Sequence, residues 1–441
     1  MKPNARVFLS AGEASGDAYG ATLISLLRER LPGTSFTGLG GSQMEQAGQV
    51  RVVNAEDVAV MGMTEILRHI PRIYGSYRKL VSSIRRERPD VAVLIDFPDV
   101  NFRLAKHLSR AGVPVVWFVS PQLWAWKRGR LRWVQERVDK MLVIFPFEEN
   151  FYRERGVDAE FVGHPLAETL VAAASRKAYA EMHGLDAAKT WIALLPGSRW
   201  KEIRGNLPVM HELAMSDLIA SSAAYTTFDG RTTVQPNDPA EHTRYEFLLP
   251  VASTIDAGAL RRYIGELNAE HLKYFGPEAS SLRLTLVSDA AEALLHARAS
   301  VVASGTATVL AAIVGNPFLV VYRVSALTFA LAKKLVKYPD ELAGIEDEAG
   351  NLPVGMVNLI AGRRVVPELL QERFTAANVA MELGKLLGDG PERETQIADL
   401  AEVRGRLAGV GLDGNGTPIG RVAEAVLALI NGSNRGVSPK P

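Results

Sequence analysis

Short runs of β-branched and other apolar residues alternate with longer amphipathic segments along the first part of the chain. Runs of this length and composition are typical of strands buried on both faces of a parallel sheet. The predicted strands are Val7–Ser10, Ser35–Leu39, Val91–Ile95, Val115–Val119, Leu142–Phe145 and Glu160–Val162. The predicted helices between them are Tyr19–Leu31, Glu65–Arg88, Phe102–Ala111, Gly129–Val138 and Glu148–Arg155. This alternation predicts a parallel sheet with right-handed crossovers.

The alternation pauses around Gly163–Pro165 and then restarts. The second set of predicted strands is Ile192–Leu195, Glu246–Pro250, Arg283–Val287, Ser300–Ala303 and Phe318–Tyr322. Predicted helices in this part are Thr306–Val314, Ala326–Val336, Asn378–Leu387, Arg393–Ala408 and Ile419–Ile430. We therefore expect an α/β protein with two Rossmann-like domains, over residues 1–165 and 190–410. A terminal helix over 411–430 and a disordered tail over 431–441 complete the predicted organisation.

The amino-acid composition excludes several classes of function for this protein. A chain of 441 residues is too long for one ordinary core, which agrees with two domains. A formal net charge of +1 argues against a strongly basic nucleic-acid binder, so no nucleic-acid partner is expected. The absence of cysteine excludes disulfides, thiolate-bound zinc and a cysteine nucleophile. With neither a secretory signal nor a membrane-spanning stretch in the sequence, we expect a cytoplasmic protein.

The segment Ala11–Asp17 follows the first predicted strand and precedes a helix. Its small residues would let the backbone approach a ligand, but Glu13 and Asp17 would repel a phosphate. Sugar hydroxyls or an acceptor suit the segment better, and Glu13, Ser15 and Gly16 are its candidate substrate contacts. The alternative is an ordinary helix start, capped by Ser15 or Asp17.

Two carboxylates follow the strand Val91–Ile95 at the same edge of the predicted sheet. Asp96 comes directly after the apolar run, where burial and a second carboxylate would raise its pKa and suit it as a general base. Asp99 is a second candidate for substrate contact. The alternative for Asp99 is a cap on the helix that begins near Asn101.

Two strand–turn–helix segments in the second domain favour phosphate binding. Gly197, Ser198 and Arg199 follow one strand, and Ser304, Gly305 and Thr306 follow another. Backbone amides and hydroxyls at such turns can hold a nucleotide diphosphate, and an arginine can neutralise charge on a departing phosphate. A surface turn with solvated charges is the alternative for the first segment. Nowhere do His, Asp and Glu have metal-ligand spacing, and the lone His164 is interpreted as structural.

The segment Val60–Ile73 combines an apolar face with nearby basic residues. Two explanations are open: an interfacial membrane contact or a helix packed on the sheet. The candidate membrane contacts are Met61, Met63, Ile66, Leu67, Ile70 and Arg72. A second segment, Ser120–Arg128, mixes aromatics with cations and suits a lipid headgroup, an acceptor or simple loop packing.

Eleven motifs occur in one order between about Val7 and Gln371, and together they closely resemble the lipid-A-disaccharide synthase family. They are AGEASGD, GLGGSQM, AVMGMTEIL, IDFPDVNF, SPQLWAWKRGR, FPFEENFY, FVGHPLAE, LLPGSR, ASGTAT, YRVS–LAKKLVK and NLIAGRRVVPELLQ. The resemblance implies a GT-B glycosyltransferase, with two Rossmann-like domains, an inter-domain cleft and a C-terminal helix that returns to the first domain.

The resemblance also implies the reaction. A UDP-2,3-diacylglucosamine donor and the acceptor 2,3-diacylglucosamine 1-phosphate (lipid X) would give a β-1′,6-linked disaccharide 1-phosphate and UDP. Asp96 and Arg199 match the family's essential carboxylate and arginine, and Glu13, Asn358 and Gln371 match other functionally important polar positions. No cofactor and no metal are expected. Because both substrates carry acyl chains, the resemblance favours the membrane interpretation of Val60–Ile73, on the cytoplasmic leaflet of the inner membrane.

The chain departs from the family pattern in a few places. Leu310 stands where a family member usually has a glutamate for the ribose hydroxyls, and extra residues occur around Ser221–Arg244 and Pro339–Pro353. The rival functions are another GT-B enzyme using a UDP-N-acetylglucosamine-type sugar and a non-catalytic nucleotide-sugar-binding protein. Homo-oligomer formation is left open.

Overall fold

A computed structural model describes residues 4–59, 66–168, 173–215, 226–228, 231–233, 244–275, 284–325, 328–329, 345–346, 350–409 and 416–432. The chain forms two compact units. The described parts of 4–168 and 406–432 belong to the first unit, and those of 173–405 belong to the second.

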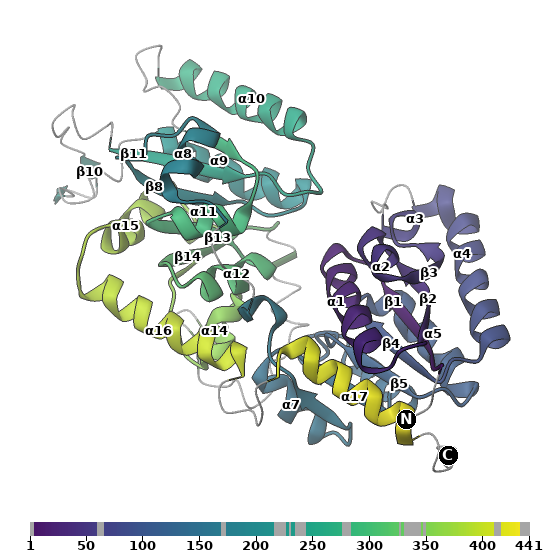
Figure 1. Ribbon diagram of the computed structural model, residues 1–441. Coiled ribbons are helices and arrows are strands. Elements are labelled where there is room, and N and C mark those ends of the chain that lie inside the picture. Colours follow the sequence, from purple (N-terminus) through teal and green to yellow (C-terminus); the bar gives the residue numbers. More distant parts are fainter. Residues whose placement is uncertain are drawn as a thin grey trace. The chain divides into compact units, whose positions relative to one another are not determined.

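The first unit is built on a seven-stranded parallel sheet in the order β3-β2-β1-β4-β5-β6-β7 (Figure 1). Its strands are β1 (Arg6–Ala11), β2 (Ser35–Gly40), β3 (Gln49–Asn54), β4 (Val91–Ile95), β5 (Val115–Phe118), β6 (Lys140–Val143) and β7 (Ala159–Phe161). Its helices are α1 (Ala14–Arg30), α2 (Ser42–Ala47), α3 (Glu56–Ala59), α4 (Ile66–Glu87), α5 (Pro98–Arg110), α6 (Leu131–Arg137), α7 (Pro146–Arg153) and α17 (Pro418–Gly432), with short 3-10 turns at Arg128–Arg130 and Pro165–Glu168.

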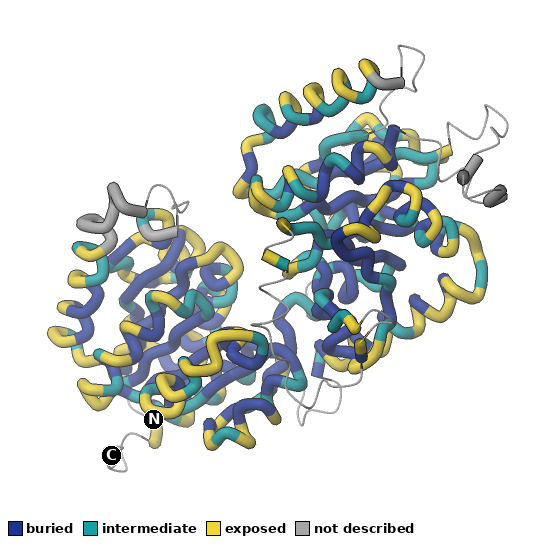
Figure 2. Tube along the Cα trace, turned by 180° about the vertical axis from the view of Figure 1, so that it is seen from behind, coloured by how far each residue is buried: buried dark blue, intermediate teal, exposed yellow. Residues whose placement is uncertain are grey.

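Burial follows the predicted pattern. Every residue of β4 is buried, as expected of a central strand covered on both faces. In Figure 2 the strands are dark blue, and the exposed yellow positions lie mainly on the outer sides of helices and on loops. The sequence prediction missed β3, an edge strand whose Val50 is 66% exposed.

The C-terminal helix α17 belongs to the first unit, where it packs against α1 and β4 (Figure 1). Its apolar side, including Val422 and Val426, is buried. Arg421 donates from Nη1 to the carbonyl oxygen of Val162 at 2.8 Å. The terminal helix therefore returns to the first unit, as the family resemblance implied.

The second unit contains a six-stranded parallel sheet in the order β12-β11-β8-β13-β14-β15. Its strands are β8 (Thr190–Leu195), β11 (Tyr245–Pro250), β12 (Leu284–Val287), β13 (Ala299–Ala303), β14 (Phe318–Tyr322) and β15 (Glu368–Leu370). Its helices are α8 (Arg176–His183), α9 (Trp200–Met215), α10 (Ala257–Phe275), α11 (Ala290–His296), α12 (Thr306–Val314), α14 (Met356–Ala361), α15 (Ala376–Leu387) and α16 (Pro391–Ala408), with a 3-10 turn at Gln371–Arg373. The last residues of α16 fall in the first unit.

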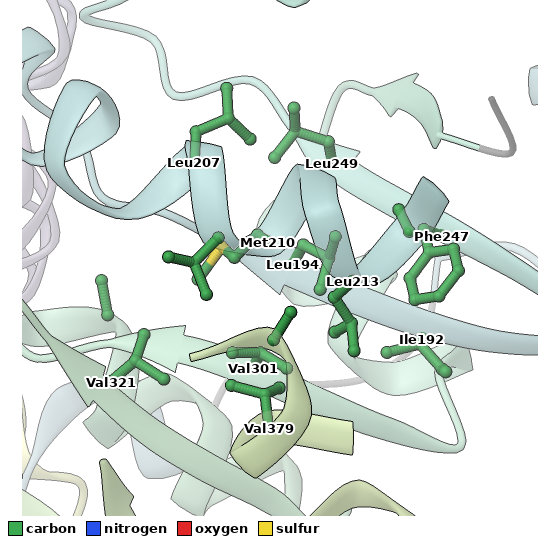
Figure 3. Packing of buried hydrophobic residues seen from close by; sticks show 14 of the residues in the cluster. Ile192, Leu194, Leu207, Met210, Leu213, Phe247, Leu249, Val301, Val321 and Val379 are labelled. Carbon is green, nitrogen blue, oxygen red and sulfur yellow. The ribbon is translucent and has the colours of Figure 1, made fainter. Parts of the chain in front are cut away.

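Alternate strand residues form one core of this sheet. Ile192 and Leu194 of β8 point to the same face as Val301 of β13, because side chains alternate along a strand. Leu207, Met210 and other residues of α9 pack against them from above the sheet, and residues of α15 complete the cluster (Figure 3).

Some predictions for the second unit were incomplete. A helix was expected after Arg199, where α9 begins, but its extent was not predicted. The three-residue edge strand β15 and the helices α8, α10, α11 and α14 were not predicted. Within the extra segment 221–244, expected to be a loop, β9 (Thr226–Phe228) pairs antiparallel with β10 (Arg231–Thr233). Most of the predicted helix Ala326–Val336 and most of 339–353 lie outside the described residues.

Candidate active site

The first sheet changes its direction of growth between β1 and β4, which are neighbours in the sheet although far apart in the chain. From β1 the chain proceeds outward through β2 and β3, then returns to β4 and proceeds outward on the other side. Ala11 pairs with Ile95 at the carboxyl ends of the two strands. Ligands of open α/β sheets bind at such a point. The loops after β1 and β4, both singled out from the sequence, flank it.

Asp96 starts the turn after β4 in a backbone conformation that L residues seldom adopt. Its φ is 46° and that of Phe97 is 49°, in a left-handed region that costs roughly 1–2 kcal/mol per residue. The N–H of Asp96 donates to the carbonyl oxygen of Phe118 at 2.9 Å. Unfavourable conformations held in place by neighbours are concentrated at functional sites. The turn is therefore a candidate site on backbone grounds as well.

The buried Asn101 holds this turn from beneath. Its Nδ2 donates to the carbonyl oxygen of Asp96 at 2.7 Å, and its Oδ1 accepts from Ser10 Oγ at 2.6 Å. Asn101 thus links the end of β1 to the end of β4. Sequence reasoning missed both Ser10 and Asn101, although an asparagine just after the Asp-Phe-Pro-Asp segment was visible as a polar residue in an otherwise apolar helix face.

The two loops also touch directly. A Cβ added to Gly12 would lie 2.4 Å from the ring of Phe97, so only glycine fits at this position. The glycine in the first loop is therefore required by the aromatic residue of the second. This contact explains why position 12 is a glycine, and the explanation does not depend on any ligand.

The environment of Asp96 suits a base that works near neutral pH. Burial, and secondly the negative charge of Glu13, raise the pKa of the Asp96 carboxyl to about 6. Burial, and secondly the negative charge of Asp96, raise the pKa of the Tyr19 hydroxyl in α1 to about 12. Glu13 itself is exposed and precedes α1 without capping it through its side chain. A half-buried carboxyl beside an exposed one is an arrangement typical of general acid–base chemistry.

Other residues of the first loop have different roles. Ser15 is exposed, whereas Gly16 is buried, where a Cβ would lie 3.3 Å from Ala11 Cβ. Asp17 is 5% exposed and accepts from the backbone N–H groups of Gly41, Gln43 and Met44. Asp17 is therefore a cap, as the alternative interpretation held, but for α2 rather than for its own helix.

Asp99 is exposed and forms an ion pair with Arg130, with 2.9 Å between Oδ1 and Nη2. The residue preceding α5, Phe97, makes no side-chain cap. A substrate group that bound Asp99 would have to share it with Arg130.

The second sheet changes direction in the same way, between β8 and β13. From β8 the chain proceeds outward through β11 and β12, and β13 then starts on the other side of β8. Val302 pairs with Leu195 near the carboxyl ends. The turns at 196–199 and 304–306 follow these two strands. The sequence-predicted phosphate turns therefore flank the switch point of the second sheet.

In the first of these turns the backbone amides are already engaged. Glu202 Oε2 accepts from the N–H groups of Ser198 (2.9 Å) and Arg199 (3.3 Å). Gly197 has φ of 123°, and a Cβ there would lie 2.5 Å from the same carboxylate oxygen. A diphosphate can use these amides only if Glu202 moves. The side chain of Arg199 is 80% exposed and lies 3.4 Å from Glu202 Oε1. Its guanidinium remains the available cation of the turn.

The second turn is joined to a neighbouring loop. Ser304 Oγ donates to the carbonyl oxygen of Val354 at 2.8 Å. Gly305, with φ of 148°, and Thr306 are exposed at the start of α12, which has no side-chain cap. Leu310 lies half-buried one turn further along α12. The exposed start of α12 is thus suited to an anion.

Asn358 and Gln371 differ in their freedom to bind a ligand. Asn358 is fully buried, with Nδ2 donating to Glu368 Oε1 (2.8 Å) and Oδ1 accepting from the N–H of Val365 (2.7 Å). The Glu368 carboxylate in turn accepts from the N–H groups of Val354 and Gly355, in the loop whose carbonyl accepts from Ser304. Gln371 follows β15 with φ of 51°, and its buried Nε2 has no hydrogen-bond partner among the described residues. The side-chain NH2 of Gln371, with two N–H donors, is therefore not engaged by other described residues.

The candidate membrane contacts are only partly covered. Met61 and Met63 lie outside the described residues. Ile66, Leu67, Ile70 and Arg72 lie within α4, and their side chains are outside the described part of the structure. Within the described part of the chain, no helix is both long and apolar enough to cross a membrane, and no group of three or more His, Asp or Glu side chains is arranged for a metal ion.

Comparison with known proteins assigns the family. A family model described as Lipid-A-disaccharide synthetase matches residues 7–224 and 268–407. Lipid-A-disaccharide synthase from Acidobacterium capsulatum is 49% identical, over 93% of this chain and 94% of the relative. The enzyme of the same name from Koribacter versatilis is 48% identical, over 91% and 93%. This chain belongs to the lipid-A-disaccharide synthetase family. It is a glycosyltransferase of lipid A biosynthesis, which confirms the resemblance that its motifs carry.

Solved structures confirm the fold class. The glycotransferase of kitacinnamycin aligns with a TM-score of 0.57 and 14% identity, over 97% of this chain and 100% of that one. The structure of MnaA from S. aureus with UDP aligns with a TM-score of 0.55 and 13% identity, over 99% of both chains. At such low identity these structures show the fold alone, a pair of Rossmann-like units.

Membership of the lipid-A-disaccharide synthetase family does not by itself assign residue roles. The roles of Asp96, Arg199 and the other site residues remain predictions. Asp96 and Arg199 lie in the turns that follow strands at the two switch points. The interpretation of His164 as structural agrees with its surroundings. It is buried, its Nδ1 accepts from the N–H of Leu166 at 3.2 Å, and burial lowers its pKa to about 4.

Proposed function

We propose that this chain transfers a 2,3-diacylglucosamine unit from its UDP-linked donor to the 6-hydroxyl of 2,3-diacylglucosamine 1-phosphate. Support comes from the family membership and from the switch point of each sheet. The single observation that carries the mechanism is the Asp96 carboxyl, whose pKa of about 6 leaves it mostly ionised yet basic at neutral pH.

Asp96 accepts the proton of the acceptor 6-hydroxyl as the oxygen attacks the anomeric carbon of the donor. The bond between that carbon and the UDP oxygen breaks, and UDP leaves. Because an α-linked donor gives a β-linked product, one direct displacement with inversion is sufficient. Glu13 raises the basicity of Asp96 and lies near the acceptor sugar. The acceptor is thereby assigned to the first unit.

The second unit binds the nucleotide. Arg199 neutralises the charge that develops on the departing diphosphate, because its exposed guanidinium can leave Glu202 for a stronger anion. The exposed start of α12, with Ser304, Gly305 and Thr306, binds a phosphate, and Gln371 supplies a side-chain donor. Leu310 lacks the polar group that ribose would need, so ribose is held by other residues.

The lipid tails imply a peripheral membrane contact. Helix α3 follows β3 directly, so the chain leaves the first sheet at its carboxyl edge, where Asp96 also lies, before it enters α4. We assign Met61, Met63, Ile66, Leu67, Ile70 and Arg72 to this contact.

A transfer assay with lipid X as acceptor tests the reaction. We expect disaccharide 1-phosphate from UDP-2,3-diacylglucosamine and none from UDP-N-acetylglucosamine. Transfer from the unacylated donor alone would assign the chain to another GT-B activity. Asp96→Ala provides the second arm, since an enzyme should lose turnover while it still binds UDP-sugar. A wild-type protein that binds UDP-sugar without any turnover would be a binding protein.

A further inference from the structure

Tyr19 of α1 is a polar residue near Asp96 to which the proposed reaction gives no role. It lies in the second turn of the helix and is half-buried. Its ring lies 6.0 Å, between centroids, from that of Phe118, the last residue of β5. The hydroxyl makes no hydrogen bond to another residue in the described part of the chain. A buried tyrosine hydroxyl usually has a hydrogen-bond partner, so this group is available to a ligand.

Two contacts place Tyr19 at the carboxyl edge of the first sheet. The backbone N–H of Asp96 donates to the carbonyl oxygen of Phe118 at 2.9 Å, so the residue that packs against Tyr19 also holds the start of the Asp96 turn. Gly16, three residues before Tyr19, lies on the same side of α1, and a Cβ there would lie 3.4 Å from Ile95 Cγ2. Ile95 directly precedes Asp96. The side of α1 that carries Tyr19 therefore faces the end of β4.

The protonation states of the two side chains are complementary. Because burial and the charge of Asp96 raise the pKa of Tyr19 to about 12, its hydroxyl is protonated at neutral pH and can donate a hydrogen bond. Asp96, with a pKa of about 6, is mostly ionised and can accept a proton. A ligand that reaches Asp96 would therefore meet a base and, close to it, a donor that no other described residue engages.

The proposed acceptor has one hydroxyl that suits this donor. In 2,3-diacylglucosamine 1-phosphate the 2- and 3-groups are acylated and the 1-hydroxyl is phosphorylated, so only the 4- and 6-hydroxyls are free. The 6-hydroxyl is assigned to Asp96, and the 4-hydroxyl is its neighbour on the same side of the sugar. We propose that Tyr19 positions the acceptor, by donating a hydrogen bond to the 4-hydroxyl oxygen and so directing the 6-hydroxyl toward Asp96. This inference rests on the proposed reaction.

Steady-state kinetics of Tyr19→Phe test the proposal, because this change removes the hydroxyl and keeps the ring against Phe118. KM for lipid X should rise about 3–10-fold, the usual effect of one neutral hydrogen bond, whereas KM for the UDP-linked donor should stay at the wild-type value. The value of kcat should fall as well, because the 6-hydroxyl is held less well for attack. Tyr179→Phe is the matched control. It removes the hydroxyl of a buried tyrosine that packs against Trp191 in the second unit, and it should change none of these values.

A 4-deoxy analogue of lipid X identifies the group that Tyr19 binds. This analogue should be a poorer acceptor for the wild type, and Tyr19→Phe should not lower its transfer further, because the bond is already absent. If Tyr19→Phe slows transfer to both acceptors by the same factor, the hydroxyl acts elsewhere and the proposal fails. An acid limb of kcat/KM that moves to higher pH in Tyr19→Phe would also contradict it, since Tyr19 would then donate to Asp96 rather than to the acceptor.

The same measurements separate this inference from the proposed reaction. Wild-type KM and kcat in Tyr19→Phe would overturn the role of Tyr19 and leave the reaction standing. Absence of transfer to lipid X by the wild-type protein would overturn the reaction, and the role of Tyr19 with it. The melting temperature of Tyr19→Phe should equal that of the wild type, because the ring packing is kept. A lower melting temperature with KM raised equally for both substrates would show a structural role and contradict the proposal.

Discussion

At the scale of single residues, the chemistry of this protein depends on how the backbone presents Asp96. Two consecutive left-handed residues, Asp96 and Phe97, turn the chain sharply after β4. Asn101 and Gly12 stabilise this turn. Asn101 donates a hydrogen bond to the carbonyl oxygen of Asp96, and Gly12 leaves room for the Phe97 ring. Replacing Asn101 or Gly12 would therefore displace the Asp96 carboxyl without removing it.

The pH profile of transfer should report the Asp96 carboxyl. A general base must be ionised, so kcat/KM should fall as pH decreases through about 6. Glu13→Gln removes the second cause of the raised pKa and should shift this acid limb to lower pH. Asp96→Asn should reduce kcat by about 10²–10⁴-fold with little change in UDP-sugar affinity. An acid limb that stays in place in Glu13→Gln would show that Glu13 does not act on the base.

Glu202 should oppose nucleotide binding through its charge. Its carboxylate occupies the amides of Ser198 and Arg199, where a diphosphate would otherwise bind. Glu202→Gln keeps an oxygen for these amides but loses the charge, so UDP should bind several-fold tighter by calorimetry. Glu202→Ala should cost about 1 kcal/mol of stability through the lost helix cap. Weaker UDP binding by Glu202→Gln would instead mean that Glu202 orients Arg199 for the phosphate.

At the scale of elements, helix α7 controls the loop after β5. Its buried Glu148 binds two groups of that loop through one carboxyl oxygen, and the other oxygen has no partner among the described residues. Val119, a β-branched residue, has φ of 63° at the start of the loop. The loop conformation is thus maintained by α7 rather than by its own sequence.

Stability measurements against pH should reveal the state of Glu148. Burial raises its pKa to about 8, whereas an unfolded glutamate titrates near about 4.3. The folded protein therefore keeps a proton that the unfolded chain loses, and stability falls as pH rises from about 4 to about 8. Glu148→Gln mimics the protonated acid and should gain melting temperature relative to wild type over this range. Glu148→Ala should be less stable than Glu148→Gln throughout, and a constant difference between Gln and wild type would contradict the raised pKa.

At the scale of the whole molecule, the first unit is assembled from both ends of the chain. Residues 4–168 supply its sheet, and 416–432 supply α17, which packs on α1. The first unit therefore needs the C-terminus, which the chain reaches only after it has built the second unit.

A charge on the buried side of α17 should selectively weaken the first unit. Val426 is fully buried, so Val426→Asp should cost about 3 kcal/mol or more. Ala428→Asp, an exposed position on the same helix, is the matched control and should be nearly neutral. Denaturant unfolding followed by tryptophan fluorescence measures both. Equal stability of the two variants would show that α17 contributes little to the unit.

Much of the fold could be predicted from the chain alone, and the misses have physical causes. Apolar runs of strand length identified the central strands because these are buried on both faces. The edge strand β3 was missed because alternate residues such as Val50 are exposed, and β15 because it has only three residues. The turns after β1, β4, β8 and β13 were found because small and polar residues follow apolar runs there.

The amino-acid sequence by itself determined the two α/β units, the family and the four turns that carry the candidate chemistry. Only the tertiary structure decided which groups in those turns remain available. It joined Ser10 to Asn101 across 91 residues beneath Asp96, directed Asp17 to α2, and satisfied Asn358 completely while leaving Gln371 a donor. Periodicity records local hydrogen bonding and burial, whereas these pairings depend on the order of strands in the sheet. That order is set by packing between distant segments, and the raised pKa of Asp96 is one of its consequences.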